Sequence, residues 1–319
     1  MWFKNLCILQ LKDAFNLTPE EFHEALSEHA ARSCGVLETA SFGWAPPLGN
    51  NHTLLVHAAM GYNMISAQKE TKLLPATVIR QYVDDKIREI ERTEARKVGS
   101  REKAKLREET TFELLPRAFH KTQSLYGYID TRNQLIIIDT ANMAKADGFL
   151  ELLRECLGSF NVSWPEVKVS PNHIMSQWLL NKQAPTGFTI DDMCELVNRK
   201  GDGATIKCVK QDMTSDEIQE HINAGKQVTQ LALTWEDRIS FVLCDNLMLK
   251  RVKFLDLIMS EAHDAQVETP EERFDADFAI MTSAISSLLP AVFALFDGLE
   301  NNETSRPTQK VEREALAEA

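Results

Sequence analysis

The residues best suited to metal chemistry are Asp275 and Asp277, which lie two positions apart in the run ERFDADF at 272–278. Two carboxylates at this spacing could bind the Mg²⁺ of a nuclease, because Mg²⁺ prefers oxygen ligands and positions phosphate groups for cleavage. A structural role fits them as well, since they come just before a long apolar segment and acidic side chains stabilise the start of a helix. We expect the structural role and no metal, and keep the Mg²⁺-dependent nuclease as an alternative.

Other patterns that carry catalysis are absent from the sequence. It has no GxGxxG or GxxxxGK[ST] phosphate-binding motif, no HExxH and no GxSxG. The six cysteines are scattered without a CxxC pair, which is typical of reduced thiols in a cytosolic protein. The sequence therefore predicts a cytoplasmic protein that is not an enzyme and uses no cofactor or metal.

The chain has 319 residues and a formal net charge of −12, but its charges are unevenly distributed. Residues 86–107 contain nine Lys and Arg against four acids, whereas residues 255–319 contain fourteen acids against four bases. Clustered cations are suited to neutralising phosphates, and an acidic exterior repels them. We predict DNA contacts by Lys86, Arg88, Arg92, Arg96, Lys97, Arg101, Lys103 and Lys105.

These cations belong to residues 75–116, whose pattern predicts two helices. Pro75 is followed by apolar residues at helical spacing as far as Ile90, after which nearly all side chains are polar. A helix that is polar on all sides has no core to join, so the segment should project as a basic helical hairpin. A solvated charged hairpin without a ligand remains the alternative.

Two further groups of residues on predicted strands could contact DNA. Lys207, Lys210 and Gln211 lie where a strand ends before a helix, and such side chains can bond to phosphates or base edges. Arg251 and Lys253 should share one face of a later strand with its leucines, by period-two alternation. An ordinary strand end without a ligand remains the alternative for the first group.

Residues 114–119 (LLPRAF) combine a cation, Arg117, with an aromatic residue, Phe119. Phe and Arg are enriched at the buried centres of protein interfaces, so both residues are candidates for a protein–protein contact, and Arg117 also for DNA. Phe119 could equally belong to the hydrophobic core, and composition does not distinguish the two.

An uncharged run of nineteen residues, 278–296, has apolar side chains at helical spacing. It reaches the length of a membrane span, but it contains several hydroxyl groups and a proline, and both flanks are acidic. We therefore expect a buried or subunit-interface helix, with Phe278, Ile285 and Leu289 in the dimer contact, and no membrane association.

The order of the predicted elements favours an α+β fold with antiparallel sheets. We expect an N-terminal α+β unit at 1–74, the hairpin at 75–116, and a central α+β unit with a β-meander at 117–254. A C-terminal helical segment at 255–300 and a disordered acidic tail at 301–319 complete the predicted organisation.

Six runs in register carry a resemblance to a known family. They are WFKNL (2–6), GWAPP (43–47), LLPRAF (114–119), VKQDMTS (209–215), LKRVKF (249–254) and ERFDADF (272–278). In order and spacing, as far as about Gly298, the chain resembles the bacterial recombination-associated RdgC family.

The resemblance implies a nucleoid-associated protein that binds double-stranded DNA with little sequence preference and limits the action of the RecA recombinase. It also implies a horseshoe-like monomer that closes into a ring-shaped homodimer around a positively charged hole. By this resemblance, Arg117 and Phe119 lie at a ring-closing contact, Lys210 and Gln211 face the DNA, and residues 75–116 form a projecting finger. A protein-interaction module that does not touch DNA remains a second alternative.

Overall fold

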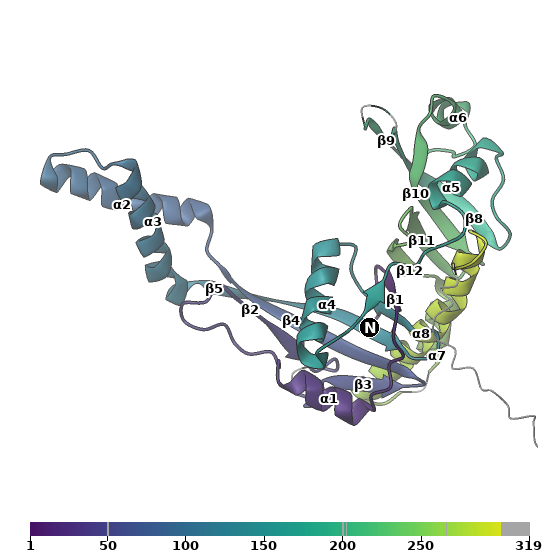
Figure 1. Ribbon diagram of the computed structural model, residues 1–319, viewed down its shortest axis with the longest axis horizontal. Coiled ribbons are helices and arrows are strands. Elements are labelled where there is room, and N and C mark those ends of the chain that lie inside the picture. Colours follow the sequence, from purple (N-terminus) through teal and green to yellow (C-terminus); the bar gives the residue numbers. More distant parts are fainter. Residues whose placement is uncertain (50, 200, 202, 266, 301–319) are drawn as a thin grey trace, which may run out of the picture.

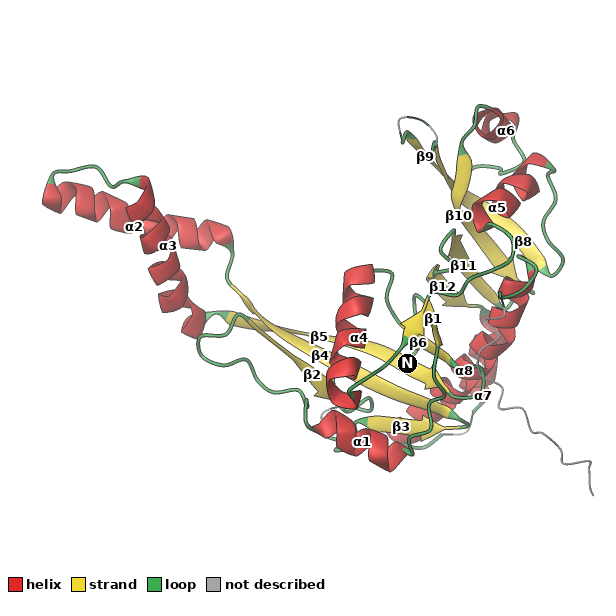
Figure 2. Ribbon diagram, in the orientation of Figure 1, coloured by secondary structure: helices red, strands yellow, loops and turns green. Residues whose placement is uncertain are grey.

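The computed structural model describes residues 1–49, 51–199, 201, 203–265 and 267–300, and it contains two antiparallel sheets with helices on their faces (Figures 1 and 2). The predicted α+β class with antiparallel sheets is therefore confirmed. The predicted acidic tail at 301–319 lies outside the described residues.

The larger sheet consists of β1 (Cys7–Leu11), β2 (Ala40–Ala45), β3 (Val56–Ala59), β4 (Tyr62–Leu73), β5 (Phe119–Asp130), β6 (Leu135–Ile138) and β7 (Val162–Ser163). The strand order is β2-β4-β5-β6-β1-β7, with β3 also paired to β4. This one sheet draws strands from residues 1–74 and from residues 119–163. The expected boundary between an N-terminal and a central unit therefore does not separate two sheets.

The smaller sheet consists of β8 (Phe188–Val197), β9 (Thr205–Val209), β10 (Gln227–Trp235), β11 (Ile239–Cys244) and β12 (Leu249–Phe254). Its order is β12-β11-β10-β8-β9, and the predicted meander is its β10-β11-β12 part. The two sheets are joined at their edges, because Leu6 and Leu249 exchange two backbone hydrogen bonds of 2.7 and 3.1 Å.

The helices are α1 (Pro19–Ser27), α2 (Ala76–Glu94), α3 (Ser100–Leu114), α4 (Met143–Leu157), α5 (Pro171–Leu180), α6 (Asp216–Asn223), α7 (Asp256–Asp264) and α8 (Pro270–Ala294), with a 3₁₀ turn η1 (Leu115–Arg117). Both α1 and α8 begin at the sequence TPEE, where Thr18 and Thr269 form capping boxes with the glutamate three residues later. These hydrogen bonds satisfy backbone N–H groups that the first helical turn leaves without partners.

Two clusters of buried side chains lie on opposite faces of the larger sheet, as the alternation along β4 and β6 requires. On one face, Ile65 and Ile136 pack with Phe149 of α4 and with α1. On the other face, Met64 and Ile137 pack with α8, the smaller sheet and α5. The larger sheet is therefore the central layer of the body.

The run GWAPPLG at 43–49, whose glycines and prolines suggest a rigid loop, begins instead within a strand. Residues 43–45 continue β2, and Trp44, paired with Ala67 of β4, is only 1% exposed and packs edge-on against Phe149. The Gly-Trp-Ala-Pro-Pro pattern is typical of a loop. Pairing with β4 and burial of a large aromatic side chain decide in favour of the strand.

The long strands β4 and β5 extend beyond the body and form what we call the arm, residues 68–73 and 119–124, with β2 beside it. The two strands stay in register from Tyr62–Asp130 to Leu73–Phe119. Residues 119–124 of β5 are exposed on both faces, because no helix covers this end of the sheet. The arm carries the hairpin of α2 and α3, which pack on each other (Figure 1).

The chain has an open, crescent-shaped outline (Figure 1). The α2–α3 hairpin stands at one end of the larger sheet and the smaller sheet at the other, and both turn toward the same side. Between them, α4 and β1 line the inside of the curve (Figure 2). This outline leaves a wide open space on one side of the molecule.

Replacing Gly43 with alanine is expected to destabilise the fold by about 1–3 kcal/mol, the usual cost of forcing extra atoms into a packed site. A Cβ at this position would lie 2.7 Å from the His29 carbonyl oxygen and 2.8 Å from the Cα of Ala31, which are backbone atoms. Urea unfolding measures the change. The matched control is Gly148→Ala in α4, where a Cβ meets nothing within 4 Å and alanine should be neutral or stabilising.

Candidate nucleic-acid interface

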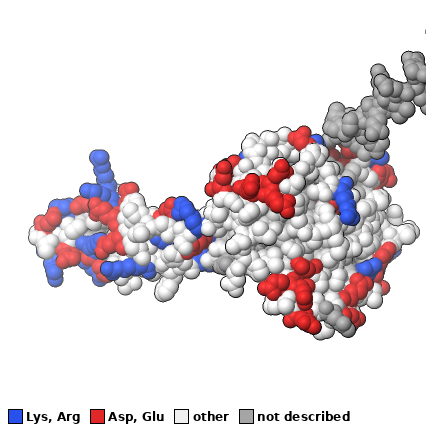
Figure 3. Space-filling model, turned by 90° about the horizontal axis from the view of Figure 1, so that it is seen from below, with Lys and Arg blue, Asp and Glu red and all other residues white. Residues whose placement is uncertain are grey.

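The α2–α3 hairpin is almost neutral as a whole but basic toward its tip. Residues 75–116 contain ten Lys and Arg against nine Asp and Glu, because Asp84, Asp85 and three glutamates near the base balance the cations. In Figure 3, Lys and Arg are interleaved with acids along the hairpin, whereas Asp and Glu gather in patches on the body. The charge surplus predicted for residues 86–107 is therefore concentrated in the outer half of the hairpin.

Several of the predicted DNA-contacting cations are already paired inside the hairpin. Arg96 donates two hydrogen bonds of 2.7 Å to Glu102 and one of 2.5 Å to Glu94, and these contacts raise its pKa. The other ion pairs are Lys86–Glu113, Arg88–Asp85 and Lys105–Glu109. These cations are held by the hairpin's own acids.

Three tip cations, Lys97, Arg101 and Lys103, are exposed and form no ion pair with any described residue. Arg92, on the last turn of α2, is exposed in the same way. The tip between the helices contributes one buried side chain, Val98, which is 6% exposed. The unpaired cations are thus free to contact a phosphate without first breaking an internal ion pair.

Phe119 is not a core residue, because 83% of its side chain is exposed. It lies at the first position of β5, directly opposite Leu73 of β4, which is 46% exposed. Arg117 precedes it on η1 and is exposed. The arm therefore ends in an exposed apolar pair beside a cation.

The arm also brings together cations that the sequence analysis missed. Lys69 lies opposite Gln123, and Lys121 lies opposite Thr71, on the same face as the Leu73–Phe119 pair. Further along the strands, this face is the one that α4 covers. No local signal identifies these lysines, since the polar run around them becomes a strand only through pairing with its partner.

At the other end of the crescent, Lys207 and Lys210 are exposed on and just after the edge strand β9. Lys210 has a left-handed backbone with φ of 58°, which turns the chain out of the strand. Gln211 is less available to contact DNA, because its side-chain amide donates a 2.7 Å hydrogen bond to Glu217. These residues lie far from the hairpin within one chain, so a single protomer does not gather them into one site (Figure 1).

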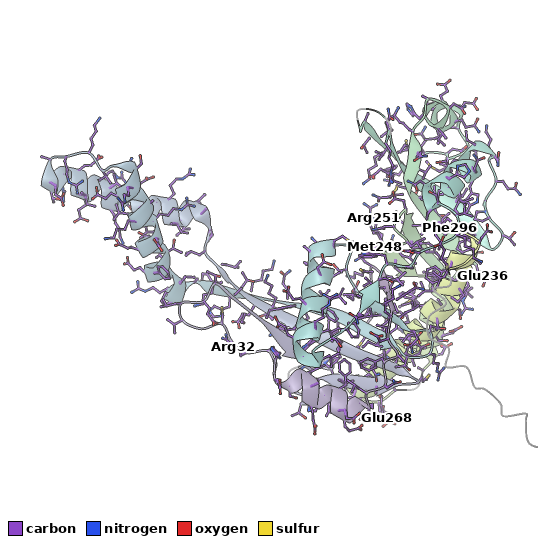
Figure 4. All side chains as sticks on the ribbon, in the orientation of Figure 1. Arg32, Glu236, Met248, Arg251, Glu268 and Phe296 are labelled. Atoms are coloured by element: carbon purple, nitrogen blue, oxygen red, sulfur yellow. The ribbon has the colours of Figure 1, made fainter. Side chains whose placement is uncertain are left out.

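Arg251 and Lys253 do not follow the predicted alternation. A bulge places two residues of β12, Arg251 and Val252, opposite Phe241 of β11, and Arg251 has a φ of 53°. As a result Arg251 and Lys253 are exposed, whereas Leu249 is buried. Figure 4 shows Arg251 on the side of the smaller sheet that faces the open space of the crescent, and Lys4 lies beside it through the backbone hydrogen bond from Val252.

The placement of Phe278, Ile285 and Leu289 at a subunit interface is corrected by their burial. They are 1%, 0% and 3% exposed and belong to the core that α8 forms with both sheets. Although α8 is long and apolar enough to span a membrane, half of its apolar stretch is buried inside the chain. The helix completes the core of one protomer and leaves these three side chains no surface to share.

Asp275 and Asp277 lie in the second turn of α8, not before the helix. The Asp277 carboxylate accepts a 2.8 Å hydrogen bond from the amino group of Met1, whereas Asp275 lies 3.1 Å from Nε2 of His57. The described residues contain no group of three side chains suited to hold a metal ion. The two carboxylates therefore serve different contacts, and they do not form one metal site.

The burial of His57 beside Asp275 predicts acid sensitivity of the fold. Burial lowers the pKa of His57 from 6.5, and the Asp275 charge only partly opposes this. Because the unfolded chain then binds a proton more readily than the folded chain, stability is lost as the pH falls below about 6.5. The slope of unfolding free energy against pH should become shallower in His57→Gln and steeper in Asp275→Asn. An identical slope in all three proteins would contradict the assignment.

Comparison with known proteins supports the family resemblance of the six runs over nearly the whole described chain. Residues 1–299 match the family model described as "Putative exonuclease, RdgC". The chain is 39% identical over 298 residues to the recombination-associated protein RdgC of Halorhodospira halophila, covering 93% of this chain and 98% of the relative. It is 38% identical to the RdgC of Aeromonas hydrophila over 302 residues, covering 95% and 100%, and 38% identical to that of Pseudomonas aeruginosa over 301 residues, covering 94% and 98%.

A family match of this length and these identities, together with the six runs in register, leaves one conclusion. The chain belongs to the RdgC family of recombination-associated proteins.

Proposed function

We propose that this protein is a sequence-nonspecific double-stranded DNA-binding protein that closes into a ring-shaped homodimer and limits the access of RecA to DNA, without catalysis of its own. A cytoplasmic, nucleoid-associated location follows from such a role. The membership in a recombination-associated family supports the involvement in recombination.

The observation that carries the proposal is the exposed Phe119 at the end of an arm that no helix covers. Exposed apolar pairs such as Leu73–Phe119 are costly in water and typical of interaction sites. In a two-fold symmetric dimer each end of the crescent would meet its own copy, so contacts at both ends close a ring. The second contact would form at the end that carries β9 and Lys210.

DNA would be held mainly through phosphates. The free tip cations, the arm lysines and the cations near Arg251 come from three separate parts of the fold, and Lys and Arg on irregular surfaces contact phosphates without reading sequence. A ring around the duplex would exclude a filament-forming recombinase from the enclosed DNA. Binding should therefore be strongly salt-dependent and similar for unrelated duplexes.

Sedimentation is expected to show a dimer of the 36.1 kDa chain at micromolar concentration. A monomer alone under these conditions would contradict the ring.

Because an encircling ring slides off a free end, closed circular DNA should retain the protein at high salt better than the same DNA after linearisation. Equal retention on both would indicate binding without encirclement.

Incubation with plasmid and Mg²⁺ separates binding from cleavage, which matters because the matching family model carries the word exonuclease in its description. We expect the protein to shift the plasmid in a gel without cutting it, and to leave linear DNA at its full length. Shortened ends would favour the nuclease alternative. The alternative of a pure protein-interaction module predicts no shift of random duplex at low salt.

A further inference from the structure

Two cysteines lie directly opposite each other on neighbouring strands, 14 residues apart in sequence. Cys194 of β8 and Cys208 of β9 are register partners in the antiparallel pairing. Opposed residues point to the same face, and their Cα atoms lie about 4.5–5.5 Å apart in antiparallel pairs. A disulfide requires about 4.4–6.8 Å, so the backbone is already close to the geometry of a cross-strand bridge.

The side chains of this pair meet at the edge of the core. Cys194 is 0% exposed and packs in the main core cluster, whereas Cys208 is partly exposed and packs against that cluster from outside. Neither cysteine forms a disulfide with another described residue, so both are free thiols. Burial, together with contact with Cys208, raises the pKa of Cys194 to about 12. Cys194 is thus a protonated thiol at neutral pH, and Cys208 is the one that a dissolved oxidant reaches.

The position of the pair in the sheet favours closure. β9 is the edge strand and is bonded only to β8, so it can move toward β8 without disturbing another strand. Lys207, the neighbour of Cys208, points to the exposed face, as alternation requires. A bridge at Cys208 would therefore form on the inner face and leave the exposed face of β9 free.

We propose that Cys194 and Cys208 form an oxidisable dithiol, in which a hydroperoxide converts Cys208 to a sulfenic acid and Cys194 then closes a cross-strand disulfide. In the first step the Cys208 sulfur attacks one peroxide oxygen, the O–O bond breaks, and hydrogen peroxide leaves one water. In the second step the Cys194 sulfur attacks the Cys208 sulfur, the S–O bond breaks, and hydroxide leaves with the Cys194 proton as a second water. Two thiols lose two electrons, and one peroxide is reduced to two waters.

The disulfide would fasten the edge strand to the body. β9 carries Lys207 and leads into Lys210, so the bridge would fix the position of the cations at this end of the crescent. Because the second step depends on the thiolate of a buried thiol, closure should accelerate as the pH rises. A reductant such as dithiothreitol would restore both thiols.

Titration of the full-length protein with hydrogen peroxide tests the proposal. The number of alkylatable thiols in denaturant is expected to fall from six to four, with one cross-linked peptide pair containing Cys194 and Cys208 in a non-reducing map. Hydrogen exchange of residues 205–209 should slow on oxidation. Cys34→Ser, which removes a cysteine of the other sheet's periphery, is the matched control and should give the same cross-link.

Two variants keep the test decisive. Cys208→Ser changes a partly exposed side chain and should fold normally, and it is expected to abolish the cross-link and leave Cys194 alkylatable after peroxide. Cys194→Ala should leave Cys208 to advance to the sulfinic acid. A wild-type protein in which Cys208 is over-oxidised while Cys194 stays free, or is linked to a different cysteine, would overturn the proposal. This outcome is independent of DNA binding, so it does not depend on the proposed function.

Discussion

Replacing Phe119 with alanine is expected to raise the dissociation constant of the dimer by at least about 30-fold, which corresponds to the roughly 2 kcal/mol lost when a central interface anchor is truncated. The side chain is 83% exposed in the protomer, so its removal takes almost nothing from the core. DNA retention at high salt should fall with the dimer, because an open crescent cannot encircle a duplex. Sedimentation and retention on circular DNA measure the two effects.

The thermal midpoint distinguishes an interface role of Phe119 from a structural one. We expect it to stay within the small range typical of surface substitutions when measured at a concentration where the wild type is monomeric. Leu257→Ala on α7, another large apolar side chain that is 59% exposed, is the matched control and should leave the dimer intact. A large fall in melting temperature with an unchanged dimer would contradict the interface assignment.

Replacing Lys97, Arg101 and Lys103 together with glutamine is expected to weaken DNA binding equally for unrelated duplexes. These cations form no ion pair with described residues, so each one can neutralise a phosphate. The slope of log K against log salt should then fall by about 0.9 for each lost contact, or about 2.7 for each hairpin. Fluorescence anisotropy over a range of salt concentrations measures the slope.

The hairpin provides its own control. Replacing Arg88, Arg96 and Lys105 with glutamine removes the same charge from the same hairpin, but these cations already pair with acids of the hairpin. If direct phosphate contact matters, the unpaired set should reduce the salt slope more than the paired set. Equal losses would show that only net charge matters. No loss with either set would make the hairpin a spacer and leave the DNA contacts to Lys207, Lys210, Gln211, Arg251 and Lys253.

Structure formed by neighbouring residues could be predicted from the sequence. Thr18-Pro-Glu-Glu predicts the start of α1, and Pro75 lies immediately before α2. Gly158, with a φ of 71°, ends α4 where a glycine is expected to end it. The same TPEE signal at Thr269 marks the start of α8, eight residues before the point at which apolar spacing alone placed it. At both TPEE starts the hydrogen-bond partners lie three residues apart, so local sequence is sufficient.

Structure formed by distant pairing was not predictable in the same way. Residues 119–124 of β5 are polar and exposed on both faces, so they show no alternation, and only their pairing with β4 makes them a strand. The bulge at Arg251 likewise depends on the facing strand β11 and breaks the alternation that placed Arg251 with Leu249. A sequence window does not contain the partner strand, and therefore it does not contain this information.

By itself, then, the sequence determined the α+β class, the helix starts, the meander and, through six runs in register, the family. Only the tertiary structure decided which chemically suitable residues are available. Phe119 is exposed at the end of an arm, whereas Phe278, Ile285 and Leu289 are buried in the core. Asp275 and Asp277 contact different partners, His57 and the amino group of Met1. The physical reason is that residue type sets what a side chain can bind, whereas burial and competing partners, often more than a hundred residues away, set what it is free to bind.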